Sequence, residues 1–218
     1  MASTVHPPGP KPLLRGVSHQ IAAAFALVGG IALVNAATGQ RGAVAAAVYG
    51  VALTAQFAIS AAYHRPRWGT RARLFMRRLD HAAIFLLIAG TYTPFCLLLP
   101  PETGRPLLAL VWSGAGAGMV LSVLWPLAPK WLMAVLTVAL GWAIVPTFPA
   151  MRAAIGWSGM ALLGAGGIAY TLGAVVYATR FPDPSPRVFG YHEVFHALVI
   201  AAAVCHYVAI AGTIGAIG

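Results

Sequence analysis

The sequence has 218 residues, of which 60% are hydrophobic and only 8% are charged. Soluble domains carry about 25% charged residues, so this chain has too little polar material to cover a surface exposed to water. A net charge of +10 would suggest nucleic acid as the partner of a soluble protein. Here the basic residues lie between long apolar runs, which is typical of topology signals and of contact with anionic lipid headgroups. Composition therefore excludes a soluble domain and indicates membrane lipids, not nucleic acid, as the surroundings.

The segments in chain order predict an all-α integral membrane protein. Residues 1–14 contain four prolines and are expected to form an irregular tail, followed by one transmembrane domain over residues 15–218. A membrane-spanning helix needs about 20 mostly apolar residues. Seven stretches qualify: 17–37, 42–63, 79–99, 106–125, 130–148, 155–179 and 188–212. The first is too long for the core of a cleaved signal peptide and is expected to stay as a helix. The sequence thus predicts a seven-transmembrane-helix bundle.

Lysine and arginine are divided unevenly between the two ends of these predicted helices. With a cytoplasmic N-terminus, eleven of the fourteen lie in cytoplasmic segments, and only Arg41, Arg105 and Arg152 lie outside. Cytoplasmic loops of membrane proteins are enriched in these residues. We therefore expect the N-terminus in the cytoplasm and the C-terminus outside. An even number of spans would break this alternation of charge.

Several ionisable residues of the predicted helices fall at one level, on the cytoplasmic side. His64 ends the second predicted helix, Asp80 begins the third, and His192 and His196 lie in the first turns of the seventh. Ionisable groups at membrane depth are costly and tend to mark function. Because separate helices place these side chains at the same level, the sequence predicts a functional site there.

The spacing of the histidines favours a metal ion. His192 and His196 are four residues apart and therefore share one helix face. A catalytic zinc takes three protein ligands and a water, and we expect His64 to be the third ligand of a Zn²⁺ ion. His19 and His81 lie at the same level, either as neighbours of the ligands or as alternatives for the third position.

Asp80 and Ser60 are the predicted catalytic residues. Zinc lowers the pKa of a bound water to about 7, so a carboxylate such as Asp80 can take its proton near neutral pH. Ser60 lies four residues before His64, and its hydroxyl could bond to that water or to a developing oxyanion. The segment 192–196 also reads H-E-x-x-H, in which the glutamate of soluble metalloproteases is the general base. Glu193 is thus either a base or an outer partner of the site.

Plainer interpretations exist for the same residues. Asp80 alone would serve as a counter-ion for Arg77 or Arg78, and Ser60 alone as a serine that bonds to its own helix backbone. His206 lies about 21 Å beyond His192 along the helix and is expected to be a packed histidine. His6 belongs to the tail.

Four segments resemble the haemolysin III family, the bacterial branch of the progestin and adipoQ receptors. They are SAAYH at 60–64, RLDHAAIF at 78–85, AGTYTP at 89–94 and YHEVFH at 191–196, and the resemblance extends over about residues 12–215. It implies a seven-helix bundle with zinc held by the residues matching His64, His192 and His196, and a water bridged to Asp80 near Ser60. It also implies kinship with adiponectin receptors, which have glutamine at the position of Glu193, and with alkaline ceramidases.

The leading functional hypothesis is a zinc-dependent intramembrane hydrolase of a ceramide-like lipid amide or ester. It would lie in the inner (plasma) membrane, with the metal site on the cytoplasmic side. An alternative is a receptor or membrane-homeostasis sensor with a structural zinc, whose fourth ligand would be Asp80, His81 or His19. A second alternative is a pore-forming or haemolytic protein, which requires a continuous polar path. The half of the predicted bundle toward the outer side of the membrane has few ionisable residues to line such a path.

Overall fold

The structure is a computed structural model that describes residues 11–217. Most of the predicted tail, including His6, lies outside the described residues. Seven α-helices and two short 3-10 helices make up the fold of the described part. They are α1 (Val17–Ala36), α2 (Gln40–His64), α3 (Thr70–Leu98), α4 (Pro101–Leu124), α5 (Lys130–Gly141), η1 (Val145–Thr147), α6 (Phe148–Thr179), α7 (Tyr191–Ala211) and η2 (Ile214–Ala216).

Among residues 11–217, six segments are long and apolar enough to cross a membrane. Four of them are α1 to α4, and another comprises α7 with η2. The remaining one is a continuous stretch of 50 residues, Lys130–Thr179, which contains α5, η1 and α6. Taken alone, α5 has only 12 residues, fewer than the roughly 20 that a span requires. The chain is therefore a multi-pass, all-helical membrane protein.

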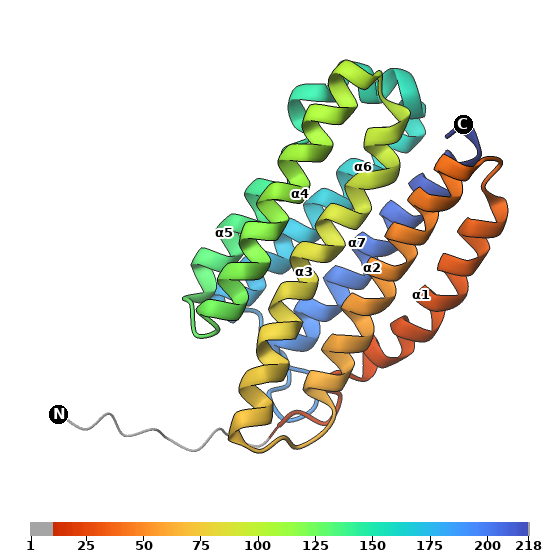
Figure 1. Ribbon diagram of the computed structural model, residues 1–218. Helices are drawn as coiled ribbons and strands as arrows, with labels where there is room; N and C mark the ends of the chain where they lie inside the picture. Colours follow the sequence, from red (N-terminus) through yellow and green to blue (C-terminus); the bar gives the residue numbers. More distant parts are fainter. Residues whose placement is uncertain (1–10, 218) are drawn as a thin grey trace.

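The helices form a bundle in which most neighbours in the chain are neighbours in space (Figure 1). Each of α1 to α4 packs against the next, α5 packs against α6 and α6 against α7, and α7 returns to α1. Helix α3 also contacts α5, α6 and α7. In its most apolar stretch, 67% of the residues are buried. The third helix is thus the centre of the bundle, and it carries Asp80 and His81.

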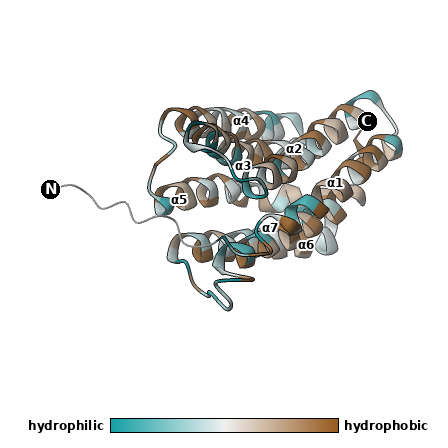
Figure 2. Cartoon of the chain, turned by 90° about the horizontal axis from the view of Figure 1, so that it is seen from below, coloured by the Kyte–Doolittle hydropathy of each residue, from teal (hydrophilic) through white to brown (hydrophobic). Residues whose placement is uncertain are grey.

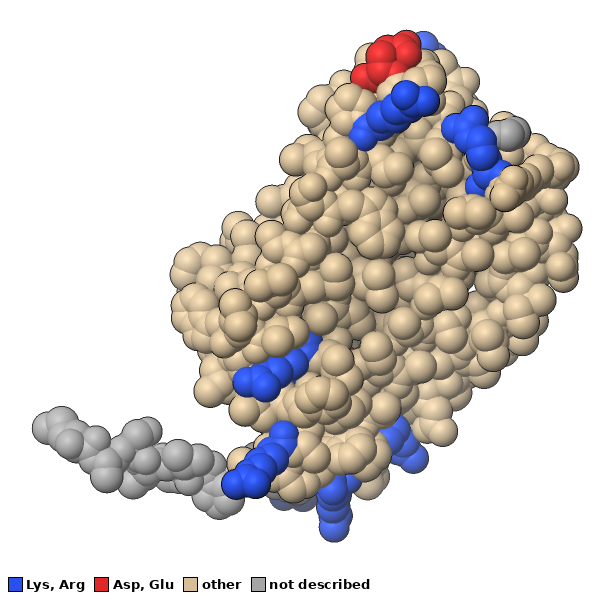
Figure 3. Space-filling view, in the orientation of Figure 1, with Lys and Arg blue, Asp and Glu red and all other residues tan. Residues whose placement is uncertain are grey.

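The outer surface of the bundle is apolar. Large hydrophobic side chains such as Phe25, Val51, Leu124 and Trp157 are exposed. Seen from below in Figure 2, hydrophilic residues gather in the segments that connect helices. Figure 3 shows lysine and arginine near both ends of the molecule, with a broad belt between them free of charge. Such a belt matches the hydrocarbon core of a bilayer, which excludes charged side chains.

Several helix ends differ from the sequence prediction. Helix α3 begins at Thr70, not at residue 79, because arginine is a good helix former and the helix continues past its apolar part. Helix α4 begins at Pro101, since proline fits the first turn of a helix. Helix α6 begins at Phe148, and the predicted start at 155 coincides with a kink at Gly156, whose φ of 65° breaks the helix.

Candidate metal centre and its cavity

Three buried histidines from two helices meet at one end of the bundle. His64 is the last residue of α2, and His192 and His196 lie in the first two turns of α7. One ligand atom of each lies within 4.8 Å of the others, and the Nε2 atoms of His64 and His192 are 3.1 Å apart. The structure thus brings together the three residues that the sequence singled out as metal ligands.

The chemistry of this cluster fits a metal ion. Two nitrogens bound to one tetrahedral zinc at about 2.0–2.1 Å would lie roughly 3.3 Å apart, close to the observed spacing of His64 and His192. The Nδ1 atom of His196 is buried without a hydrogen-bond partner. A buried nitrogen left unpaired is costly, and bonding of that ring to a metal would offset part of the cost.

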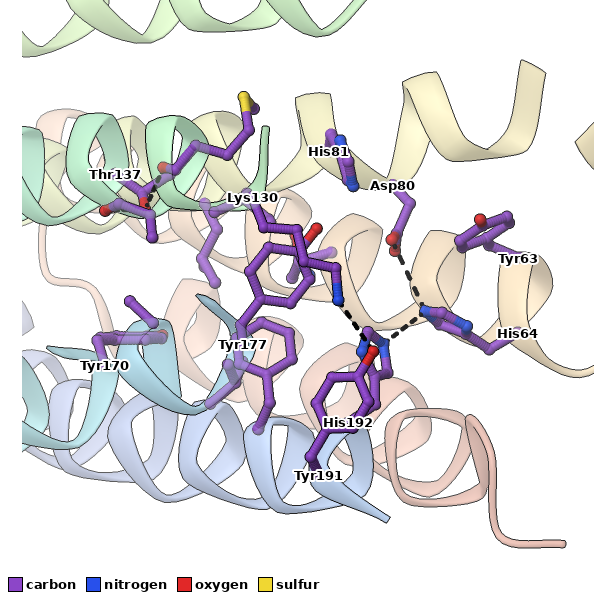
Figure 4. Close-up of a pocket in the computed structure, with 18 of the residues that line it drawn as sticks. Tyr63, His64, Asp80, His81, Lys130, Thr137, Tyr170, Tyr177, Tyr191 and His192 are labelled. Carbon is purple, nitrogen blue, oxygen red and sulfur yellow. Dashed lines mark hydrogen bonds and ion pairs between the residues drawn. The ribbon is translucent and has the colours of Figure 1, made fainter. Parts of the chain in front are cut away.

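Asp80 and Ser60 lie next to the histidines. The Oδ2 atom of Asp80 is 3.8 Å from Nε2 of His64, and Figure 4 shows both side chains pointing toward each other. The Ser60 hydroxyl lies beside the Asp80 carboxyl, but Ser60 is 2% exposed and does not line the cavity described below. The catalytic roles of both residues remain predictions, and the position of Ser60 favours contact with Asp80 over contact with a ligand.

His19 and His81 take different positions around the cluster. The ring of His19 stacks on that of His196, with centroids 3.7 Å apart and planes 8° from parallel. Both of its ring nitrogens are buried without a hydrogen-bond partner. His81 follows Asp80 on α3 and lines the cavity. Neither belongs to the group of three whose ligand atoms converge.

Glu193 faces the start of its own helix and the N-terminal segment. Its Oε2 accepts a hydrogen bond from the backbone N–H of Gly190 at 2.8 Å, and its Oε1 pairs with the guanidinium of Arg15. It is 2% exposed and does not line the cavity. Its contacts match those of an outer partner that fixes the first turn of α7. No pattern in the sequence indicates that Arg15, 178 residues away, is that partner.

The segment before α1 braces this end of the molecule. The backbone N–H groups of Leu13 and Leu14 donate to the carbonyls of Arg187 and Val188 at 3.0 and 3.1 Å. Lys11 donates to the carbonyl of Arg65 at 3.0 Å. Partial burial, and then the neighbouring arginines, lower the pKa of Lys11. The segment therefore joins the α2–α3 and α6–α7 connections and, through Arg15, the helix that carries two of the histidines.

A cavity of about 1290 Å³ opens beside the histidines and continues into the bundle. His64, Asp80 and His192 line one part of it, as Figure 4 shows. Lys130, which in the sequence is one of the basic residues of the predicted cytoplasmic segments, lies there with its Nζ 2.9 Å from the hydroxyl of Tyr191. His206 lines the cavity as well, and its Nε2 lies 3.2 Å from the carbonyl of Leu163. This contact agrees with a packed, hydrogen-bonded histidine.

Comparison with known proteins identifies the family. The model of the family described as "Haemolysin-III related" matches residues 9–207. The chain belongs to this family. It is 32% identical to Hemolysin-3 of Bacillus cereus over 76% of this chain and 77% of that protein. It is 32% identical to the Hemolysin-3 homolog of Bacillus subtilis over 56% of this chain and 55% of that protein. Rice (Oryza sativa) heptahelical transmembrane protein ADIPOR2 is 32% identical over 64% of this chain and 68% of its own length.

The family membership agrees with the resemblance found in the sequence. The matched range contains every residue of the histidine cluster, together with Ser60, Asp80 and Glu193. The rice relatives belong to the same family, so the chain shares a family with proteins of the adiponectin-receptor type. The family is thereby established for an all-helical membrane protein whose three clustered histidines could hold a metal ion.

Proposed function

We propose that this protein is a zinc-dependent hydrolase of the inner membrane that cleaves a lipid amide or ester. The observation that carries the proposal is the convergence of His64, His192 and His196, with ligand atoms within 4.8 Å of one another, beside a carboxyl group. An intramembrane cavity of about 1290 Å³ adjoins them. It is large enough for a lipid, since pockets for drug-sized ligands occupy about 300–1000 Å³.

The histidines would hold the ion, and the neighbouring residues would manage protons. When bound, zinc acts as a Lewis acid toward the substrate carbonyl and toward water. Asp80 would accept the proton that water loses as its oxygen bonds to the acyl carbon. It can return that proton to the departing nitrogen or oxygen, so the bond that breaks ends in an amine or alcohol and a fatty acid. Ser60 would hold the Asp80 carboxyl in place.

We further propose seven membrane crossings, with the N-terminus and the metal centre on the cytoplasmic side. As one straight helix, the 50 residues of Lys130–Thr179 would be about 75 Å long, more than twice the roughly 30 Å of the hydrocarbon core. Helix α5 lies beside α6, which supports two crossings in this stretch. Rice relatives carry the word heptahelical in their names. The excess of Lys and Arg at the end with the histidines supports a cytoplasmic position.

The first experiment is elemental analysis of detergent-purified wild-type protein beside His192→Ala and Asp80→Asn variants. We expect about one zinc per chain in the wild type, loss of zinc from His192→Ala and retention in Asp80→Asn. Hydrolysis of lipid amides and esters is then measured on the same samples. Asp80→Asn should turn over substrate about 10²- to 10⁴-fold more slowly, the usual contribution of a general base.

Other results would redirect the proposal. Folded wild-type protein without zinc would remove the hydrolase mechanism. Loss of zinc from Asp80→Asn, combined with no hydrolysis by the wild type, would make the carboxylate a fourth ligand of a structural ion. The protein would then be interpreted as a receptor or a sensor of the membrane.

A further inference from the structure

The cavity beside the histidines carries a large excess of positive charge. Eight lysine and arginine side chains line it, against two acids, Asp80 and Asp183. Both acids are engaged: Asp80 lies 3.8 Å from His64, and Asp183 accepts a hydrogen bond from the backbone N–H of Tyr191 at 2.7 Å. Within residues 11–217, the one lysine or arginine paired with an acid is Arg15. Among the described residues, the other seven cations of the cavity make no ion pair, although Arg77 is near enough to Asp80 to interact with its charge.

Two of these cations are half-buried and lie beside the candidate metal centre. The Nζ of Lys130 is 4.6 and 4.8 Å from the ring centroids of Tyr177 and Tyr191. The centroids of the same two rings lie 6.1 and 6.0 Å from that of His192. Arg77 precedes Asp80 by three residues on α3, so the two share a helix face. The Nε of Arg77 is buried and has no hydrogen-bond partner.

Topology explains some of this charge but not these two residues. Exposed arginines of the rim, such as Arg65, Arg67 and Arg180, follow the enrichment of cytoplasmic loops in basic residues. A half-buried cation that faces a cavity must be desolvated in part, which is costly unless an anion accompanies it. The planar guanidinium presents a fork of donors that suits phosphate oxygens, and apolar walls strengthen the field of both groups.

We propose that the cavity takes an acyl lipid whose headgroup bears a phosphate, held by Lys130 and Arg77. The acyl chain lies along the apolar wall formed by Leu87, Met133 and Phe195, toward His206. His192 and His206 are separated by about 21 Å along α7, a length that accommodates a long chain. The proposal rests on the proposed function for the chemistry at the histidines and adds the class of lipid on which that chemistry acts.

The test compares two probes that differ only in the phosphate, 1-oleoylglycerol 3-phosphate and 1-oleoylglycerol. Binding to zinc-loaded protein in a non-ionic detergent is measured by microscale thermophoresis, with glycerol 3-phosphate as the probe that lacks the acyl chain. We expect the wild type to bind the phosphate lipid at least about tenfold more tightly than either other probe. Arg77→Gln with Lys130→Gln should remove that preference, whereas Arg41→Gln with Arg105→Gln, which removes the same charge at the opposite end, should keep it.

Equal binding of the two lipids by the wild type would overturn the proposal, as would an unchanged preference in the Arg77 and Lys130 variant. Should that variant fail to fold, the comparison of the lipids on the wild type, repeated at rising salt, still decides. The proposed hydrolase is tested separately, because binding needs no turnover. Preference for the phosphate lipid without hydrolysis would refute the hydrolase alone, and hydrolysis of neutral lipid without the preference would refute this inference alone.

Discussion

Glu193 shows how one residue type in one pattern can serve two chemistries. In soluble metalloproteases the glutamate of H-E-x-x-H is a general base. Here both of its carboxylate oxygens are engaged, by the backbone N–H of Gly190 and by Arg15, and Glu193 itself does not line the cavity. An acid near a helix N-terminus is also favoured by the helix dipole. The side chain therefore holds the first turn of α7, the turn in which His192 lies.

We predict that Glu193→Gln lowers stability and leaves the chemistry in place. The amide can still accept the hydrogen bond from Gly190, but Arg15 loses its partner, which should reduce the free energy of unfolding by about 1–3 kcal/mol. Zinc content should not change, and turnover should fall by no more than a few-fold. Thermal unfolding, elemental analysis and lipid hydrolysis on one preparation measure the three quantities.

Arg15→Gln and the double variant provide the control. Because the two residues are in contact, their effects on stability should be less than additive in a double-mutant cycle. A drop of 10²-fold or more in turnover with normal zinc content would show instead that Glu193 takes part in proton transfer.

At the residue scale, the sequence predicted the histidines better than their surroundings. The interval between His192 and His196 sets their common face, and the order of charges along the chain places His64 at the same level. Arg15 and Glu193, or Lys130 and Tyr191, meet only because distant helix ends pack together. Gln56 also lines the cavity, and its signal in the sequence is that it is a polar residue at membrane depth, two turns before His64 on α2.

At the scale of the helices, hydropathy located the apolar segments but not their ends. It reports the part of a helix that lies in lipid, so the predicted range 79–99 leaves out the basic turns at the start of α3. Residue 155, the predicted start of the sixth helix, lies beside Gly156, whose φ of 65° interrupts the helix that begins at Phe148. Propensity and capping, which operate beyond the apolar stretch, determine these boundaries.

The packing of α1 on α2 depends on glycine at a point of close approach. A Cβ at Gly50 would lie 2.8 Å from Cα of Gly30 on the facing helix. That contact is with backbone, which cannot move aside as a flexible side chain can. Small residues at helix interfaces are how membrane helices approach closely. We predict that Gly50→Ala lowers the free energy of unfolding by about 1–3 kcal/mol, as overpacking does, measured as a lower melting temperature in detergent.

Gly116→Ala is the matched control, since a Cβ there meets nothing within 4 Å. Loss of a helical glycine should leave stability unchanged or raise it by about 0.5–1 kcal/mol. Equal melting temperatures for the two variants would mean that α1 and α2 are not packed as closely as described.

At the scale of the whole molecule, the path of Lys130–Thr179 through the membrane decides how many times the chain crosses it. The return of α7 to α1 and the central position of α3 come from packing and could not be read from hydropathy, which treats each segment alone. Two crossings of this stretch would put both of its ends on one side of the membrane. One crossing would put them on opposite sides.

Cysteine accessibility separates the two paths. Single cysteines replace Leu127, before α5, Val145, between α5 and α6, and Pro184, before α7, all of them exposed, with Cys96 and Cys205 changed to alanine. In intact cells, a membrane-impermeant maleimide should label Val145→Cys and leave Leu127→Cys and Pro184→Cys unlabelled until the membrane is opened. This is the result expected from seven crossings with basic residues inside. Opposite labelling of the sites at Leu127 and Pro184 would mean six crossings. It would place the α6–α7 connection on the opposite side of the membrane from the α2–α3 connection, and so would contradict the packing that joins the two through the segment before α1.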